Sequence, residues 1–294
     1  MVPVTERSGV IHDLGYRHYD GPRDGAATIA RTLYVTGLRH AFGLGRSGRS
    51  KILPFLLLAL AALPGAIVVG VVTIVGLSEL PLTYADYTHQ TQLLVSLFAA
   101  AQAPVLFSRD LRYRSIVLYL ARPLPAHVIA LTRWASLLSA LLVFTLLPLL
   151  ILYAGALLAG LDVGEQTVGL LKAVALLVLV AAMLAGITGF ISSVSLRRGL
   201  AVVGSIVVLV VVPGVVTAVQ AITSEVDADR VGVAAGLVSP WSLTNGLASA
   251  WDAGVRVFTP PSGAWVAAYL AIAVLIAAVG LAAIVARFLK VGSR

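Results

Sequence analysis

Six long apolar stretches divide this chain, and positive charge is concentrated in alternate gaps between them. A helix needs about 20 apolar residues to cross the hydrocarbon core of a bilayer. Five of the six stretches reach that length. The pattern predicts an all-α polytopic membrane protein with a transmembrane domain over residues 52–285. The predicted crossings are Ile52–Leu77, Gln92–Phe107, Ala135–Leu157, Leu171–Leu196, Leu200–Val219 and Trp265–Val285.

The distribution of basic residues predicts the orientation of these crossings. Eighteen of the 21 Lys and Arg residues lie in residues 1–51, 108–134, 197–198 and the tail 286–294. Basic residues resist translocation and therefore stay on the cytoplasmic side. Both termini are accordingly predicted to be cytoplasmic. The first 50 residues are polar and basic, so we expect no cleavable signal peptide.

Composition excludes several classes of protein. Only 12% of the residues are charged, against about 25% in an ordinary soluble domain. The net charge of +8 follows the membrane topology, which favours anionic lipid as the partner and argues against nucleic acid. The chain has no cysteine, so disulfides, thiolate catalysis and cysteine-based metal sites are excluded.

Residues 1–51 are expected to form a cytoplasmic tail that ends in an interfacial helix. Within Ala26–Phe42, the apolar residues Ile29, Leu33 and Phe42 recur at helical spacing, and basic residues fall mostly elsewhere on the helical wheel. A helix with an apolar face and basic flanks tends to lie in the plane of the membrane interface.

The last external gap, residues 220–264, is much longer than the others. Its acidic part, Ser224–Arg230, is expected to be a solvated loop. Ser239 then resembles a helix N-cap, and Pro240 follows at the first helical position. Because tryptophan favours the membrane–water boundary, the short helix Trp241–Trp251 is predicted to be re-entrant or to lie on the outer surface. A seventh crossing is the alternative, but it would place the basic C-terminal tail outside.

One segment resembles a phosphate-binding loop. Gly43–Ser50 fits the spacing G-x-x-x-x-G-K-[ST], except that Arg49 replaces the lysine. The motif requires a preceding strand, so that backbone N–H groups converge on phosphates. Here an amphipathic helix precedes it and a membrane crossing follows, so nucleotide binding by this chain is not expected.

Ionisable residues are missing from the middle of the predicted crossings. All five histidines and every Asp and Glu lie outside them. Intramembrane proteases need such residues for catalysis, and proton-coupled carriers need them for proton relays. We therefore expect no catalytic, cofactor-binding or metal-binding residues, and any transport would draw its energy from a partner.

The cytoplasmic segment 108–134 is the most specific feature after the topology. Asp110 lies in the first turn after the second crossing, and an apolar stripe including Leu120 follows. Arg122–Pro125 then interrupts the helix, since proline disfavours helix at the residue before it. A new helix from Ala126 leads into the third crossing. The pattern predicts a helix–turn–helix hairpin beyond the membrane; a loop folded back on the lipid headgroups is the alternative.

Taken together, these features resemble the six-helix permease subunits of ABC exporters of the ABC-2 type. Ser108–Asp110 matches the Ser-Arg-acidic start that follows the second crossing of those permeases. Leu118–Pro123, which reads LYLARP, matches their Leu-Leu-Ala-Arg-Pro turn. The middle departs from the family pattern, because Arg114–Ser115 stands for Gly-Thr and Val117 for an acidic residue.

The resemblance implies a dimer of six-helix subunits, identical or different, in a bacterial plasma membrane. Each subunit would dock on a separate ATP-binding cassette ATPase, which would bind ATP and Mg²⁺. This chain would then carry no cofactor, and its substrate would be an apolar or amphipathic drug, lipid or peptide. The implied ATPase-coupling residues are Asp110, Leu118, Leu120, Arg122, Pro123 and Leu124. The implied outer re-entrant helix starts with Ser239, Pro240 and Trp241.

Two other functions remain open from the sequence. The chain could be a non-transporting membrane scaffold that recruits a cytosolic partner through the same hairpin. It could also be a secondary carrier, against which the absence of intramembrane charge counts. ATP-dependent flux separates the exporter from both.

Overall fold

The computed structural model describes residues 21, 25–108, 124–195 and 197–292. Within these residues every regular element is a helix, as the sequence predicts. The elements in chain order are α1 (Ala26–Ala41), α2 (Arg49–Val75), α3 (Tyr84–Leu106), α6 (Ala126–Leu158), α7 (Val163–Val194), α8 (Arg198–Ile206), the π-helix η1 (Val207–Val211), α9 (Val212–Glu225), α10 (Asp229–Gly236), α11 (Pro240–Ala250) and α12 (Ala264–Gly292).

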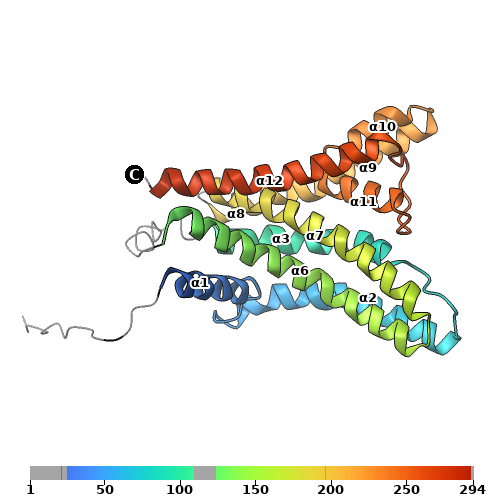
Figure 1. Cartoon of the computed structure of the whole chain (residues 1–294), viewed down its shortest axis with the longest axis horizontal. Coiled ribbons are helices and arrows are strands. Elements are labelled where there is room, and N and C mark those ends of the chain that lie inside the picture. Colours follow the sequence, from blue (N-terminus) through green and yellow to red (C-terminus); the bar gives the residue numbers. More distant parts are fainter. Residues whose placement is uncertain (1–20, 22–24, 109–123, 196, 293–294) are drawn as a thin grey trace, which may run out of the picture.

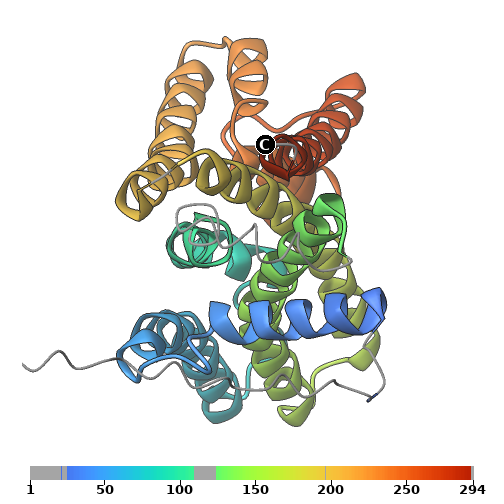
Figure 2. The same cartoon turned by 90° about the vertical axis from the view of Figure 1, so that its left-hand side faces the viewer.

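Five helices of the described residues are long and apolar enough to cross a membrane. They are α2, α6, α7, the continuous helix α8–η1–α9 and α12, and each has 27 to 33 residues. About 20 residues suffice for a crossing. Figures 1 and 2 show the long helices running along the long axis of the molecule as one bundle. A multi-pass, all-helical membrane architecture is therefore confirmed.

The second predicted crossing is helical but differs in character from these five. α3 begins at Tyr84 rather than at Gln92, because Thr83 and Asp86 form a capping box at its start. Thirteen of its 23 residues are buried, and it contacts α2, α6, α7, α8 and α11. A helix that its neighbours cover in this way does not need a lipid-compatible surface.

Other boundaries also extend beyond the predicted ones. α7 starts at Val163, where the Asp162 side chain accepts a hydrogen bond from the Glu165 amide at 2.7 Å. The solvated loop expected over Ser224–Arg230 is present but shorter, because α9 continues to Glu225 and α10 begins at Asp229. The predicted helix start at Ala126 is confirmed for α6.

α7 and α12 cross with their backbones in close contact. A Cβ atom placed on Gly280 would lie only 2.7 Å from the Gly186 Cα atom. Small residues allow helix backbones to approach closely where no hydrophobic force drives association. Next to α7, Phe98 of α3 stacks on Phe144 of α6 with ring centroids 4.3 Å apart. Backbone proximity and aromatic packing together hold this core.

The Tyr87 side chain of α3 bonds two backbone groups of α2 beside Pro64. The Tyr87 hydroxyl of α3 accepts a hydrogen bond from the Gly65 amide at 3.0 Å. The same hydroxyl donates to the carbonyl oxygen of Ala61. Insertion of a side chain between an amide and its i−4 carbonyl is a recognised cause of helix bending. Tyr87 thus satisfies both backbone groups and ties α3 to α2.

α1 lies across one end of the bundle (Figure 2). Its helical character agrees with the prediction, whereas its placement at a lipid interface stays a prediction. The face that carries Leu33, Gly37 and Ala41 is buried, and α6 is its main neighbour. The Tyr34 hydroxyl donates to Ser139 at 2.7 Å. The apolar face of α1 therefore covers protein rather than lipid.

Candidate functional site

Most of the predicted coupling residues lie outside the described residues. This holds for Asp110, Leu118, Leu120, Arg122 and Pro123, so their roles stay predictions. Leu124 is described, and it differs from expectation. It is 3% exposed and belongs to the core of this chain, so it is not an exposed tip that could enter a groove on a partner.

The predicted start of the short helix after Val231 is confirmed in α11. The Ser239 hydroxyl accepts a hydrogen bond from the Ser242 amide at 3.3 Å, and Pro240 occupies the first turn. The expectation that both tryptophans lie at a membrane boundary is wrong for Trp241. Trp241 is 1% exposed and lies inside the protein, whereas Trp251 is 38% exposed.

A chain of hydrogen bonds, which we call the polar seam, joins α11 to α3 and to η1. Trp241 Nε1 donates to Ser96 Oγ at 2.8 Å. Ser96 Oγ in turn donates to the carbonyl oxygens of Gln92 at 2.7 Å and, more weakly, of Leu209 in η1 at 3.3 Å. π-Helical segments are frequent at functional sites. The seam therefore connects the α11 helix to the one segment of π-helix in the described residues.

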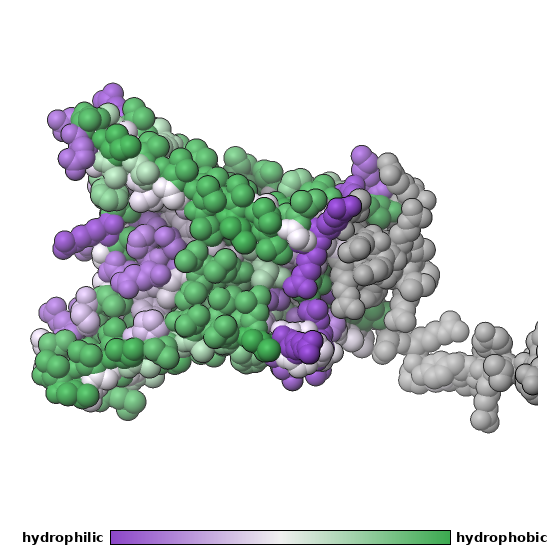
Figure 3. All heavy atoms as spheres, turned by 180° about the vertical axis from the view of Figure 1, so that it is seen from behind, coloured by the Kyte–Doolittle hydropathy of each residue, from purple (hydrophilic) through white to green (hydrophobic). Residues whose placement is uncertain are grey.

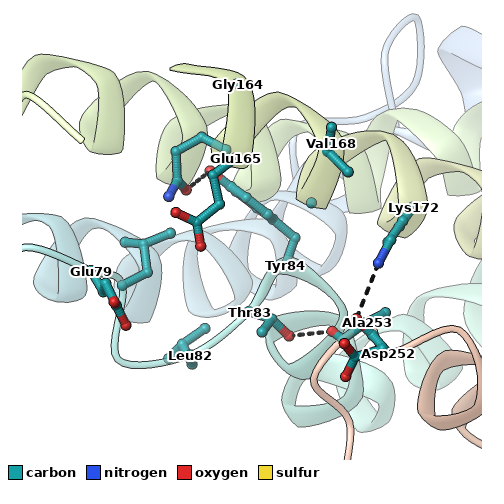
Figure 4. Close-up of a pocket in the computed structure, with 13 residues that line it drawn as sticks. Glu79, Leu82, Thr83, Tyr84, Gly164, Glu165, Val168, Lys172, Asp252 and Ala253 are labelled. Atoms are coloured by element: carbon teal, nitrogen blue, oxygen red, sulfur yellow. Dashed lines mark hydrogen bonds between the residues drawn. The ribbon is translucent and has the colours of Figure 1, made fainter. Parts of the chain in front are cut away.

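A hollow lies at the end of the bundle opposite α1, and we call it the end cavity. Figure 3 shows hydrophilic surface in a recess between two apolar arms at this end. The cavity has a volume of about 480 Å³, within the range of about 300–1,000 Å³ that is usual for ligand pockets. Its lining comes from three separate parts of the chain (Figure 4): Glu79, Leu80, Leu82, Thr83, Tyr84, Gly164, Glu165, Gln166, Val168, Gly169, Lys172, Asp252 and Ala253.

Thr83 fixes one wall of the end cavity. Its hydroxyl accepts a hydrogen bond from the Asp86 amide at 3.1 Å as the N-cap of α3. The same hydroxyl donates to the Ala253 carbonyl oxygen at 2.7 Å, across 170 positions of sequence. Gly254 follows with φ +95, and a Cβ atom there would lie 2.8 Å from the Thr83 Cβ atom. Only glycine accommodates both the left-handed conformation and the close approach.

The opposite wall is held by two further interactions. The Tyr84 hydroxyl donates to Gln166 Oε1 at 2.8 Å, which joins α3 to α7. Lys172 Nζ donates to the carbonyl oxygens of Trp251 at 3.1 Å and Asp252 at 3.2 Å. Figure 4 shows the Lys172 ammonium directed at this loop. Since helix C-termini carry unsatisfied carbonyls and partial negative charge, Lys172 acts as a cap for the end of α11.

The carboxylates at this end divide into two kinds. Asp86 and Asp162 cap helices: Asp86 Oδ2 accepts from the Thr83 amide at 3.3 Å, and Asp162 caps α7. Glu79, Glu165 and Asp252 line the end cavity, and within the described residues their carboxylates make no hydrogen bond or ion pair. The lining therefore carries an excess of negative charge, with Lys172 as its one basic residue.

The sequence contained part of this signal. Glu79, Asp86, Asp162 and Glu165 make the two short external gaps net acidic. The convergence of these gaps with the loop at Asp252 was not predicted. The described residues contain no group of three or more His, Cys, Asp or Glu side chains suited to holding a metal ion.

Neither protein-family models nor curated protein sequences match this chain. Its function is therefore argued from the residues and their geometry. Two features bear on it: the sequence between α3 and α6, and the end cavity, which lies at the end of the bundle opposite α1.

Proposed function

We propose that this chain is the permease subunit of an ATP-binding cassette exporter of the ABC-2 type. It would move an apolar or amphipathic substrate, with ATP hydrolysed by a separate subunit. The observation that carries the proposal is the segment between α3 and α6. This segment bears the Ser-Arg-Asp start and the LYLARP turn, and it joins two helices that both end on the side of the bundle where α1 lies.

A topology of six crossings is part of this proposal. In it, α3 is a crossing in addition to the five long apolar helices, and it comes second in the chain. At 1.5 Å per residue, the 23 residues of α3 span about 35 Å, enough for a hydrocarbon core of about 30 Å. Its burial among its neighbours supports a crossing that is shielded from lipid. With six crossings, both termini fall on one side. Most basic residues also belong to that side, which we assign to the cytoplasm of a bacterial cell.

The proposal also requires a source of energy for transport outside this chain. The described crossings carry ionisable side chains only toward their ends, so a proton relay through the bundle has no residues to use. A partner ATPase that docks on the α3–α6 segment would supply the work instead. A second permease subunit, identical or different, would complete the translocation path. Arg122 would pair with an acidic residue of the ATPase.

Copurification with an ATPase tests the proposal. The tagged chain is purified from its host in mild detergent, the copurifying chains are identified, and ATP hydrolysis is measured. We expect a stoichiometric ATPase whose association is lost in Arg122→Glu and kept in Arg112→Glu, a charge reversal in the same segment outside the turn. Unchanged ATPase association and transport in Arg122→Glu would refute the coupling role. A partner without nucleotide chemistry would indicate a scaffold, and flux that follows an ion gradient would indicate a carrier.

A further inference from the structure

Five basic residues gather where α1 turns into α2, and we call this surface the basic corner: Arg31, Arg39, Arg46, Arg49 and Lys51. All except Arg46 are exposed, and these four make no hydrogen bond or ion pair within the described residues. No carboxylate lies nearby to balance them, because every described Asp and Glu lies in the loops and helix ends at the opposite end of the bundle (Figure 1). The basic corner therefore presents positive charge at the surface.

The turn between α1 and α2 brings these residues together. The amide of Leu44 donates to the Arg39 carbonyl oxygen at 2.8 Å, which ends α1. Gly43 has φ +72, and a Cβ atom there would lie 2.8 Å from the Lys51 amide nitrogen, so glycine is needed for this close return. Retention of basic residues in the cytoplasm explains the side of the membrane on which they lie. It does not require a turn that joins the basic residues of two helices in one place.

Two of these cations do not stabilise the helix that carries them. Arg49 and Lys51 lie in the first turn of α2, which contains no acidic residue and whose N-cap, Gly48, makes no side-chain bond. The N-terminus of a helix carries partial positive charge, which favours acidic residues and disfavours cations. α3 and α7, which begin at the other end of the bundle, follow the favourable pattern with Asp86 and Glu165 in their first turns. An anion bound beside α2 would offset the unfavourable charge there.

The basic corner is set back from the end of the bundle. The Ser136 hydroxyl donates to the Tyr34 carbonyl oxygen of α1 at 3.0 Å. Ser136 lies ten residues after the start of α6, which is about 15 Å along that helix. At the end of α1, the ring centroid of Phe42 lies 5.5 Å from that of Phe98, eight residues before the end of α3. α3 and α6 thus extend beyond α1, so the segment between them starts farther out than the basic corner.

The surface beside the basic corner is apolar. Ile52, Leu53 and Phe55 follow Lys51 on α2 and are exposed, Ile52 by 62%. Figure 3 shows hydrophilic side chains bordering the apolar surface at this end of the molecule. A ligand here meets cations on one side and an exposed apolar helix on the other. This combination matches the headgroup and acyl chains of a phospholipid better than it matches a soluble anion.

We infer that the basic corner binds the phosphate-bearing headgroups of anionic phospholipids, whose acyl chains lie against the exposed face of α2. Clusters of about four to eight Lys and Arg residues beside a membrane helix are typical of anionic-lipid binding. The inference gives a use to Gly43–Ser50, which has the spacing of a phosphate-binding loop without the preceding strand. It goes beyond the proposed function, and lipid binding itself requires no ATPase.

Binding is measured with a fluorophore on Ser47→Cys, an exposed position in the loop between α1 and α2 of a chain that has no other cysteine. The full chain is placed in phosphatidylcholine vesicles with a minor fraction of spin-labelled phosphatidylglycerol. Spin-labelled phosphatidylcholine is the matched neutral lipid, and quenching gives the ratio of the two association constants. We expect about tenfold preference for the anionic lipid, because contact with each of two cations contributes about fivefold in water and salt screens part of this gain.

Variants of the Ser47→Cys chain then assign the site. Arg39→Gln/Arg49→Gln removes one exposed cation from each helix, and glutamine is a good helix former. We expect this variant to lower the preference about fivefold. Arg39→Lys/Arg49→Lys keeps both charges and should retain the preference. Arg197→Gln/Arg198→Gln removes equal charge from exposed residues at the start of α8, at the same end of the bundle, and should leave quenching of the probe unchanged.

Three results would overturn the inference. Equal association constants for the two lipids would exclude selective binding. An equal fall of the preference in Arg39→Gln/Arg49→Gln and in Arg197→Gln/Arg198→Gln, or no fall in either, would show that the basic corner does not select the lipid. Loss of the preference on addition of inorganic phosphate at constant ionic strength would indicate a site for a soluble anion.

The outcome is separate from that of the proposed function, because the chain is assayed without an ATPase. If the anionic lipid is preferred but no ATPase copurifies, the proposed function fails and this inference stands. If an ATPase copurifies and the two lipids bind equally, the reverse holds.

Discussion

The indole nitrogen of Trp241 donates a hydrogen bond to the hydroxyl of Ser96 at 2.8 Å, and this bond joins α11 to the buried face of α3. Both residues are 1% exposed. A buried indole N–H usually finds a partner, because leaving it unpaired costs free energy. The bond explains why α11 packs inside the bundle although it begins with a residue that usually marks a membrane boundary.

We predict that Ser96→Ala lowers the free energy of unfolding by about 1–3 kcal/mol, because it leaves the Trp241 N–H without an acceptor. A double-mutant cycle with Trp241→Phe should give a coupling energy of about 0.6 kcal/mol, the average for such bonds in membrane proteins. Denaturation of the purified chain in mixed detergent measures both values. Ser47→Ala, at an exposed loop position, is the control. A coupling energy of zero would mean that the bond contributes nothing.

Tyr87→Phe should destabilise the protein through α2. The change removes the hydroxyl that bonds both the Gly65 amide and the Ala61 carbonyl, so two backbone groups beside Pro64 lose their partner. We expect a loss of about 1–3 kcal/mol, as for a buried unsatisfied group. Tyr153→Phe, which removes a part-buried bond to Thr167, should cost less. Equal effects of the two variants in the same denaturation assay would contradict the role of Tyr87 as a bridge.

Gly280→Leu should separate α7 from α12. Even a Cβ atom at this position would lie 2.7 Å from the Gly186 Cα atom, and the neighbouring backbone has no flexible side chain that can move away. Overpacking typically costs about 1–3 kcal/mol, and here we expect the upper end. Gly70→Leu on α2 is the matched control, because no atom lies within 4 Å of its added Cβ atom. A similar melting temperature for both variants would show that the crossing is not tight in the membrane protein.

The crossing by α3 can be tested with single cysteines, since the natural chain contains none. Glu79→Cys lies before α3 and His127→Cys lies just after the start of α6, and both positions are exposed. In oriented vesicles, a membrane-impermeant maleimide should label them from opposite sides, with Glu79→Cys labelled from outside. Labelling of both from one side would exclude α3 as a crossing. The unsubstituted chain is the control for background labelling.

Hydropathy predicted the helices with apolar exposed faces, but it misjudged where α3 begins, a helix that its neighbours largely cover. α2, α6 and α12 carry continuous apolar sequence because their exposed faces need it. α3 begins among polar residues, and its start is set by the Thr83–Asp86 capping box, which hydropathy does not register. For the same reason α7 begins earlier in the chain than predicted: Asp162 provides an N-cap that hydropathy does not register.

Local signals were reliable where the interaction is local. Ser239 and Pro240 predicted the start of α11, because the N-cap bond spans only three residues. Trp241 was misplaced, since its partner Ser96 lies 145 positions away in the sequence. The end cavity was missed for the same reason: Glu79, Glu165 and Asp252 come from three gaps that only the folded bundle brings together.

Gly254→Ala is the sharpest test of how the wall of the end cavity is built. Gly254 has φ +95, a conformation that costs about 1–2 kcal/mol for a residue with a Cβ atom. The new Cβ atom would also press on the Thr83 side chain, whose hydroxyl holds Ala253 at 2.7 Å. Both effects should lower thermal stability, and displacement of the loop should weaken any ligand bound in the cavity.

The contribution of the Thr83 methyl group can be isolated in a Thr83→Ser background. Serine keeps the hydroxyl that caps α3 and bonds Ala253, but it lacks the methyl group that meets the new Cβ atom. Gly254→Ala should therefore cost less in Thr83→Ser than in the natural chain, by an amount that reports the clash with the methyl group, since the contacts of the new Cβ atom with the hydroxyl oxygen and the Cβ atom of residue 83 remain. Gly48→Ala, at a position with φ −52 and open space around it, should be neutral. If Thr83→Ser gives no rescue, the methyl group of Thr83 contributes nothing to the cost of Gly254→Ala, and this prediction is wrong.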